Sequence, residues 1–116
     1  MSERYALSDV TGTVPLDDAA AVADAIDGIL SRRYGAGQFD HALLGASFAL
    51  VERLFAGDHP GYLACDMPYH DLRHSLDAAL AMARLVDGYQ QQGGTTAAAL
   101  TPDLALVAVL LALLHD

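Results

Sequence analysis

Apolar residues recur three or four positions apart along most of the chain after residue 15, which is the spacing of amphipathic helices. Residues 16–34 show this spacing, with acidic residues at the start and two arginines at the end, where positive charge favours the helix dipole. We expect a first helix here, stopped by Gly35 and Gly37. Residues 1–15 contain Gly12 and Pro15 and show no clear periodicity, so they are predicted to form an irregular N-terminal arm.

Three more helices are expected further along the chain. The second covers residues 39–56 and the third 69–89, and the segment between them, 58–68, is predicted to be a loop because it is rich in proline and glycine. Residues 90–99 are predicted to be a linker, and Thr101-Pro102-Asp103 favours the start of a fourth helix. The side chains expected to point inward are Leu43, Leu44, Phe48, Val51, Leu54 and Phe55 in the second helix, and Leu72, Leu76, Ala79, Leu80, Ala83 and Val86 in the third.

The fold class is therefore predicted to be all-α, a bundle of about four main helices that forms one domain over residues 16–116. No alternating β pattern and no internal repeat is present in the sequence. The most apolar run, residues 104–114, has eleven residues, whereas a membrane span needs about 20. We expect it to be a helix buried on all sides, and we expect no membrane partner.

Composition and charge narrow the classes of function. The chain has 116 residues, 53% of them hydrophobic and 18% charged, as is typical of one compact domain. Its net charge of −9 disfavours nucleic acid binding through a basic patch. A small nucleotide remains compatible, because a bound divalent cation inverts the local field. The single Cys65 and the polar N-terminus favour a cytoplasmic location.

Two histidine motifs are candidates for chemistry. His70 and His74 are four residues apart, so on a helix they share one side, where both could bind one metal ion or one could bind metal while the other faces the substrate. His115 and Asp116 follow an apolar helix, a setting in which ionisable groups are costly unless they are paired or bound to metal. The alternative interpretation is that both motifs are solvated helix ends. His41 is interpreted as a surface residue.

The stretch PYHDLRHSLDAALAMARL, followed by LTPDLALVAVLLALLHD, resembles the first half of the HD-domain metal-dependent phosphohydrolases. The cyclic nucleotide phosphodiesterase branch is the most similar, with a Tyr-His-Asn-x-x-His-Ala-x-Asp-Val motif before an apolar helix that ends in His-Asp. The resemblance covers about residues 66–116. Asp71 stands where that motif has Asn, and Ser75 where it has Ala.

This resemblance implies the N-terminal part of an HD-domain fold and an enzyme that hydrolyses a nucleotide phosphodiester, cyclic nucleotides included, or a phosphomonoester. It implies a divalent metal ion; histidine and carboxylate ligands accept Zn, Mn, Fe, Ni or Mg. The implied roles are metal ligation for His74, His115 and Asp116, general acid catalysis for His70, a position beside the substrate pocket for Tyr69, and support of the ligands for Asp77. Asp77 could equally be a solvated helix carboxylate.

The final metal-binding aspartate of that family lies on a later helix, so we expect this chain to be an N-terminal piece of a longer protein. The alternative function is a non-catalytic helical interaction or regulatory module with an incomplete metal site. An apolar last helix without covering partners also predicts a homo-oligomer that forms through that helix.

Overall fold

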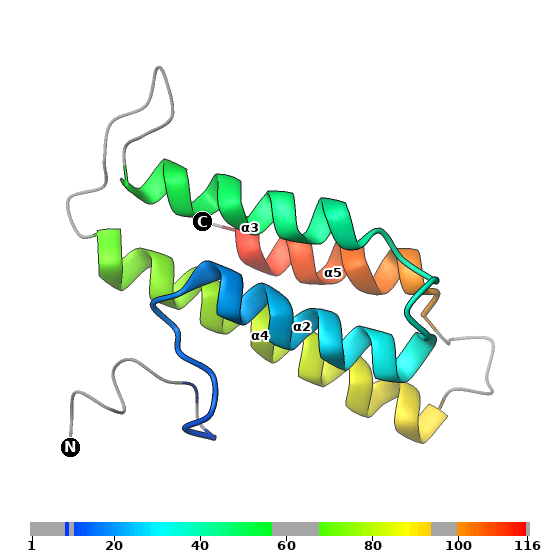
Figure 1. The fold of residues 1–116 in the computed structure, drawn as a ribbon. Coiled ribbons are helices and arrows are strands. Elements are labelled where there is room, and N and C mark those ends of the chain that lie inside the picture. The colour runs from blue at the N-terminus through cyan, green and yellow to red at the C-terminus, as the bar shows by residue number, and fades with distance from the viewer. Residues whose placement is uncertain (1–8, 10, 57–67, 94–99, 116) are drawn as a thin grey trace.

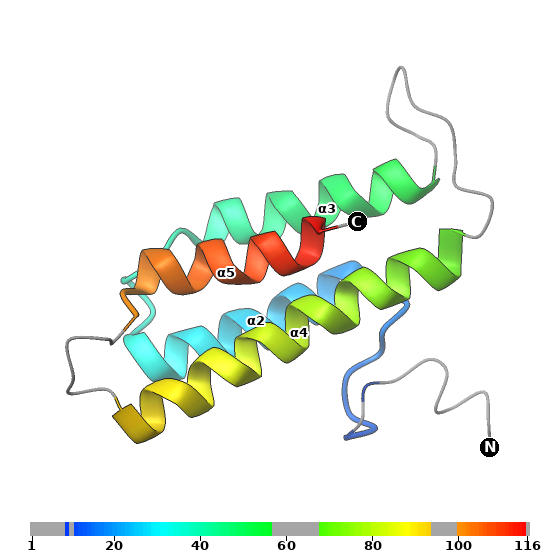
Figure 2. The same ribbon diagram turned by 180° about the vertical axis from the view of Figure 1, so that it is seen from behind.

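The computed structural model describes residues 9, 11–56, 68–93 and 100–115, and these residues form an all-α bundle. The helices are α2 (Ala19–Tyr34), α3 (His41–Ala56), α4 (Pro68–Gly93) and α5 (Pro102–Leu114). Helix α2 packs against α3 and α4, and α5 packs mainly against α4. Figure 1 and Figure 2 show that α2 and α4 run in one direction and α3 and α5 in the other. The predicted fold class is confirmed, while residues 58–67, with Cys65, lie outside the described residues.

Both ends of α2 are fixed by local hydrogen bonds. At its start, the Asp18 carboxylate accepts a hydrogen bond from the amide of Ala21 at 3.1 Å. At its end, Gly35 has a φ of 104°, and its amide donates to the carbonyl of Ser31 at 2.8 Å. A side chain rarely tolerates that backbone angle, so glycine allows the chain to leave the helix and turn towards α3.

Helix α3 begins at His41, two residues later than predicted. The reason is Asp40, whose carboxylate accepts a hydrogen bond from the amide of Leu43 at 2.9 Å and so caps the helix. Phe39 precedes the cap and is buried in the core.

Helix α4 continues to Gly93, so the prediction of a linker beginning at residue 90 is wrong for residues 90–93. Glutamine is a good helix former, and the Gln90 side chain accepts a hydrogen bond from the amide of Leu100 at 2.8 Å. The hydroxyl of Tyr34 donates to the carbonyl of Leu100 at 3.0 Å. These contacts tie the end of α4 and the start of α5 to α2.

The core lies between the four helices and follows most of the predicted pattern. All six residues of α4 expected to point inward are buried, as are Leu44, Phe48 and Val51 of α3. Leu43 was expected in the core and is 47% exposed, so that assignment is wrong. The apolar face of α3 is narrower than predicted: Leu44, Phe48 and Val51 recur four and three residues apart on one buried face, and Leu43 lies at the edge of that face.

Helix α5 is buried on one face only, which corrects the prediction of burial on all sides. Its inner face consists of Ala105, Leu106, Val109 and Leu113. Its outer face consists of Leu104, Val107, Leu111 and Leu114, which are 53%, 48%, 66% and 56% exposed. The physical reason is its position at the edge of the described bundle, with α4 as its main neighbour. In the described part of the chain, no helix has the length and apolar character needed to cross a membrane.

Candidate functional site

The structure brings together two of the predicted metal ligands, His74 and His115. Because α4 and α5 are antiparallel, the last turn of α5 lies beside the N-terminal part of α4, whose first turn extends beyond the end of α5 (Figure 2). The two imidazole ring centroids are 5.6 Å apart, and the ring planes are inclined by 59°. Both residues are exposed, so the pair lies at the surface, at one end of the bundle, where a small ligand can reach it.

The geometry of His115 fixes which of its nitrogens carries hydrogen. Its Nδ1 lies 2.6 Å from the carbonyl oxygen of Ala112, one turn earlier in α5. Because a carbonyl only accepts, Nδ1 is the donor, and in the neutral ring the lone pair is then on Nε2. A histidine that ligates a metal commonly makes the same hydrogen bond through its other nitrogen.

The separation of the two rings is compatible with a shared metal ion. Ring nitrogens bind zinc at about 2.1 Å, and for tetrahedral geometry this places the two ring centroids roughly 5 Å apart. The observed 5.6 Å is close to that value. Within the described residues, no group of three or more His, Cys, Asp or Glu side chains could hold a metal, so His74 and His115 stay a pair of candidate ligands.

The other predicted site residues flank this pair along the chain. Tyr69 and His70 lie in the first turn of α4, but their side chains are outside the described residues. Asp116 directly follows His115 and is also outside them. Asp77 is exposed on α4 about one turn after His74. The roles of these four residues stay predictions.

A second histidine site connects α2 to the start of α3. The Nδ1 of His41 lies 2.5 Å from a carboxylate oxygen of Asp27, and its Nε2 contacts the carbonyl oxygen of Ala36. The hydroxyl of Ser31 donates to the other oxygen of Asp27 at 3.1 Å. The pKa of His41 is raised above 6.5, first by the bond to Ala36 and then by Asp27. With an acceptor at each nitrogen, His41 favours its protonated form and has a structural role.

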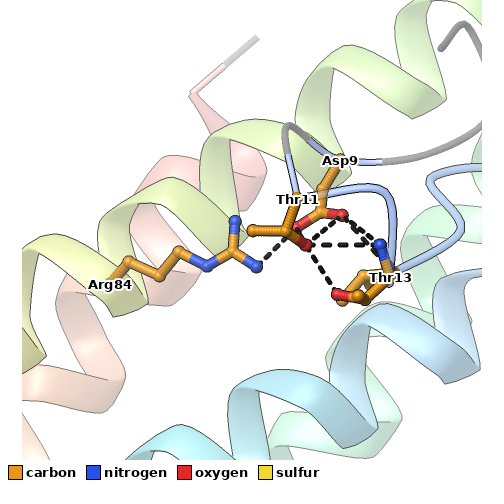
Figure 3. Close-up of polar contacts among 5 residues, drawn as sticks. Asp9, Thr11, Thr13 and Arg84 are labelled. Atoms are coloured by element: carbon orange, nitrogen blue, oxygen red, sulfur yellow. Dashed lines mark hydrogen bonds and ion pairs between the residues drawn. The ribbon is translucent and has the colours of Figure 1, made fainter.

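A buried carboxylate attaches the N-terminal arm to α4 (Figure 3). Asp9, whose side chain has no exposed surface, accepts hydrogen bonds from the Thr11 hydroxyl at 2.8 Å, from the amides of Thr13 and Val14 at 3.1 and 3.0 Å, and from Arg84 at 2.5 Å. Burial acts to raise the pKa of Asp9, but these bonds, that of Val14 first, outweigh it and hold the pKa well below 3.8. Asp9 therefore stays ionised at neutral pH and fixes the described part of the arm against α4.

The arm closes one side of an open cleft of about 410 Å³ between α2 and α4. Four charged side chains line it, and two of them are already engaged, since Arg84 binds Asp9 and Asp87 binds Arg33 at 2.7 Å. The cleft does not include His74 or His115. Its lining consists of Thr13, Val14, Asp24, Ala25, Gly28, Ile29, Arg32, Arg84 and Asp87.

Sequence reasoning missed both the Asp9 cluster and the structural role of His41. The segment Asp9 to Thr13 contains a turn signal, because an aspartate two residues before a Thr-Gly pair favours side-chain bonds to nearby amides. Its partner Arg84 is far away in sequence and carries no local signal. The pairing of His41 with Asp27 likewise depends on how α2 and α3 pack.

The chain was also compared with known proteins. Searches against models of protein families, against curated proteins and against solved structures found no match.

Proposed function

We propose that the chain is a metal-dependent phosphohydrolase of the HD class, acting on a nucleotide phosphodiester, cyclic nucleotides included, or on a phosphomonoester. The observation that supports this most directly is the proximity of His74 and His115. Their motifs are separated by most of α4 and α5, yet the rings lie close together. The HD pattern requires this proximity, whereas two solvated helix ends do not.

Each residue of the proposed site has a chemical role. His74, His115 and the adjacent Asp116 hold a divalent cation. When bound, such a cation offsets the charge of a phosphoryl group and lowers the pKa of a water molecule towards about 7. His70 is four residues before His74, so both are expected on one side of α4. A histidine with an ordinary pKa of about 6.5 can donate its proton to the leaving oxygen near neutral pH.

The acidity of the protein supports a small substrate. A net charge of −9 repels long polyanions, whereas a cation at the histidine pair would attract a single phosphate group locally. The proposed substrate class is therefore a small nucleotide ester.

Metal binding by purified variants tests the proposal. We expect the wild type to bind a divalent cation in plasma mass spectrometry or calorimetry, and His74→Ala and His115→Ala to lose that binding. His41→Gln is the matched control, because it removes a histidine that lies outside the pair and should retain the metal. Circular dichroism should confirm that every variant is helical. Metal retained by His74→Ala, or absent from the wild type, would contradict the proposal.

Hydrolysis of bis(p-nitrophenyl) phosphate and of a panel of cyclic nucleotides then tests the role of His70. His70→Ala should retain the metal and lose rate by about 10²–10⁴-fold, as expected when a general acid is removed. An unchanged rate in His70→Ala would mean that another group protonates the leaving oxygen.

A helical interaction module is the second candidate function, and the exposed apolar face of α5 favours it. The two candidate functions differ in whether the protein hydrolyses a phosphate ester. A chain that binds metal at the histidine pair and hydrolyses none of these esters with any of the five candidate metals would be assigned to the module.

A further inference from the structure

The exposed face of α5 carries an uninterrupted apolar seam. Leu104, Val107, Leu111 and Leu114 are each about half exposed or more, and they are spaced three, four and three residues apart. This is the spacing by which two helices pack along each other with interlocking side chains. We propose that this seam is an interface between two copies of the chain, paired antiparallel about a two-fold axis.

The seam is complementary to itself in the antiparallel direction. Its spacing is the same from either end, so Leu104 lies level with Leu114 of the second copy and Val107 level with Leu111 of the second copy. The two-fold axis then crosses the seam midway between Val107 and Leu111, at the level of Val109, whose side chain is buried on the opposite face of α5. A two-fold interface requires one surface to match itself in this way.

The charge distribution favours this face over the rest of the surface. The protein has a net charge of −9, so most pairings of two copies bring acidic groups together. The other helices present exposed acids, among them Asp24, Glu52 and Asp77. Helix α5 has one charged residue, Asp103, at its N-terminal end. Antiparallel pairing also sets the opposite ends of the two helix dipoles side by side, which is favourable.

Helix α4 extends the apolar surface beside the seam. Helices α4 and α5 are antiparallel, and His74 contacts His115. A residue of α4 that follows His74 by a given number of positions is therefore level with the residue of α5 that precedes His115 by the same number. Leu85 is eleven residues, or about three turns, after His74, so it lies on the same side of α4 as His74 and level with Leu104; it is 65% exposed. The interface gains an apolar edge at that end.

The size of the surface sets the expected strength of the dimer. A standard stable interface involves about 20–30 residues on each side. The outer half of a 13-residue helix and one leucine of α4 supply fewer than that. We therefore expect a weak dimer, with a dissociation constant in the micromolar range or above.

Sedimentation velocity over a series of concentrations tests the pairing. The average mass of the wild type should rise from the 12.2 kDa of one chain towards twice that value. Leu111→Gln should move this rise to concentrations at least about tenfold higher, because it places an amide at the middle of the seam. Leu43→Gln is the matched control: it makes the same change at an exposed leucine of α3 and should behave like the wild type. Leucine and glutamine have similar helix propensity, so both variants should fold.

Three results would overturn the proposal: a constant monomer mass up to millimolar concentration, equal weakening by both variants, or growth beyond the dimer. Disulfide formation tests the direction of pairing in a Cys65→Ser background. A mixture of Val107→Cys chains and Leu111→Cys chains should form more disulfide-linked dimer than either variant alone, because the two α-carbons of a disulfide must lie within about 7 Å. Cross-linking that is strongest for each variant with itself would indicate parallel pairing and contradict the proposed axis.

Discussion

Replacing Asp9 by asparagine should release the N-terminal arm from α4. Asparagine has nearly the same shape and keeps one oxygen for the amides of Thr13 and Val14, but it carries no charge. Its amide group would also present a donor where the Thr11 hydroxyl and Arg84 both donate. The substitution therefore removes the charge-assisted bonds and leaves the local backbone contacts.

The magnitude follows from the bonds that are lost. A hydrogen bond to a charged group contributes about 1.5–3 kcal/mol. Arg84 is 35% exposed, and water partly screens its pairing, which favours the lower half of that range. We expect a loss of about 2 kcal/mol in the free energy of unfolding. For a chain of this length, that corresponds to a fall in Tm of roughly 6–12 °C.

Urea denaturation followed by circular dichroism measures this loss, and its dependence on pH tests the cause. The pKa of Asp9 is lowered in the folded state, so its contribution is complete above the unfolded pKa of about 3.9 and is lost as the pH falls towards the folded value. The difference between wild type and Asp9→Asn should be constant from about pH 7 to pH 5 and shrink below about pH 4.

The control is Asp17→Asn, which removes the same charge from an exposed residue and should change stability by less than about 0.5 kcal/mol. Equal stability of Asp9→Asn and Asp17→Asn at pH 7 would refute the reasoning, because the buried carboxylate would then contribute no more than a solvated one.

Two further predictions concern the ends of α2 and α3. The pKa of His41 is raised in the folded state, so the contribution of His41 to stability should be complete below about pH 6.5 and be lost as the pH rises through the folded pKa. The difference in urea midpoint between wild type and His41→Gln should therefore shrink at alkaline pH. A difference that stays constant with pH would contradict this prediction. Gly35→Ala should lower the free energy of unfolding by about 1–3 kcal/mol because φ is 104°, whereas Gly88→Ala, inside α4 with open space around it, should raise it by about 0.5–1 kcal/mol. Thermal melting compares the two glycine variants, and a loss of similar size in both would show that the backbone angle is not the cause.

The helices could be predicted from the sequence because their signals are local. The spacing of apolar residues identified the four helices of the described residues, and Thr101 with Pro102 identified the start of α5. The end of α4 was placed too early because the bond between Gln90 and Leu100, which stabilises the last turn, depends on how α4 and α5 pack.

The candidate site was predictable only in part, because some of its contacts depend on how the helices pack. The motifs around His74 and His115 predicted a shared site, and the antiparallel helices bring the rings together. Which face of α5 is buried could not be predicted, because that helix is apolar on every side and its packing against the neighbouring helices determines which residues are buried. The Asp9 cluster was missed because Arg84 has many alternative partners in a chain this acidic.

The position of the two histidines has a consequence for the unfolded chain. One lies near the start of α4 and the other at the end of α5, so an ion that binds both closes a loop of roughly 40 residues. Closing a loop of that length reduces the entropy of the unfolded state, which for a permanent cross-link corresponds to about 4 kcal/mol. An ion held by both histidines would be released when the helices separate, so its stabilisation of the α4–α5 hairpin would depend on the ion concentration rather than equal that of a permanent cross-link. The two helices would be expected to unfold together while the ion is bound.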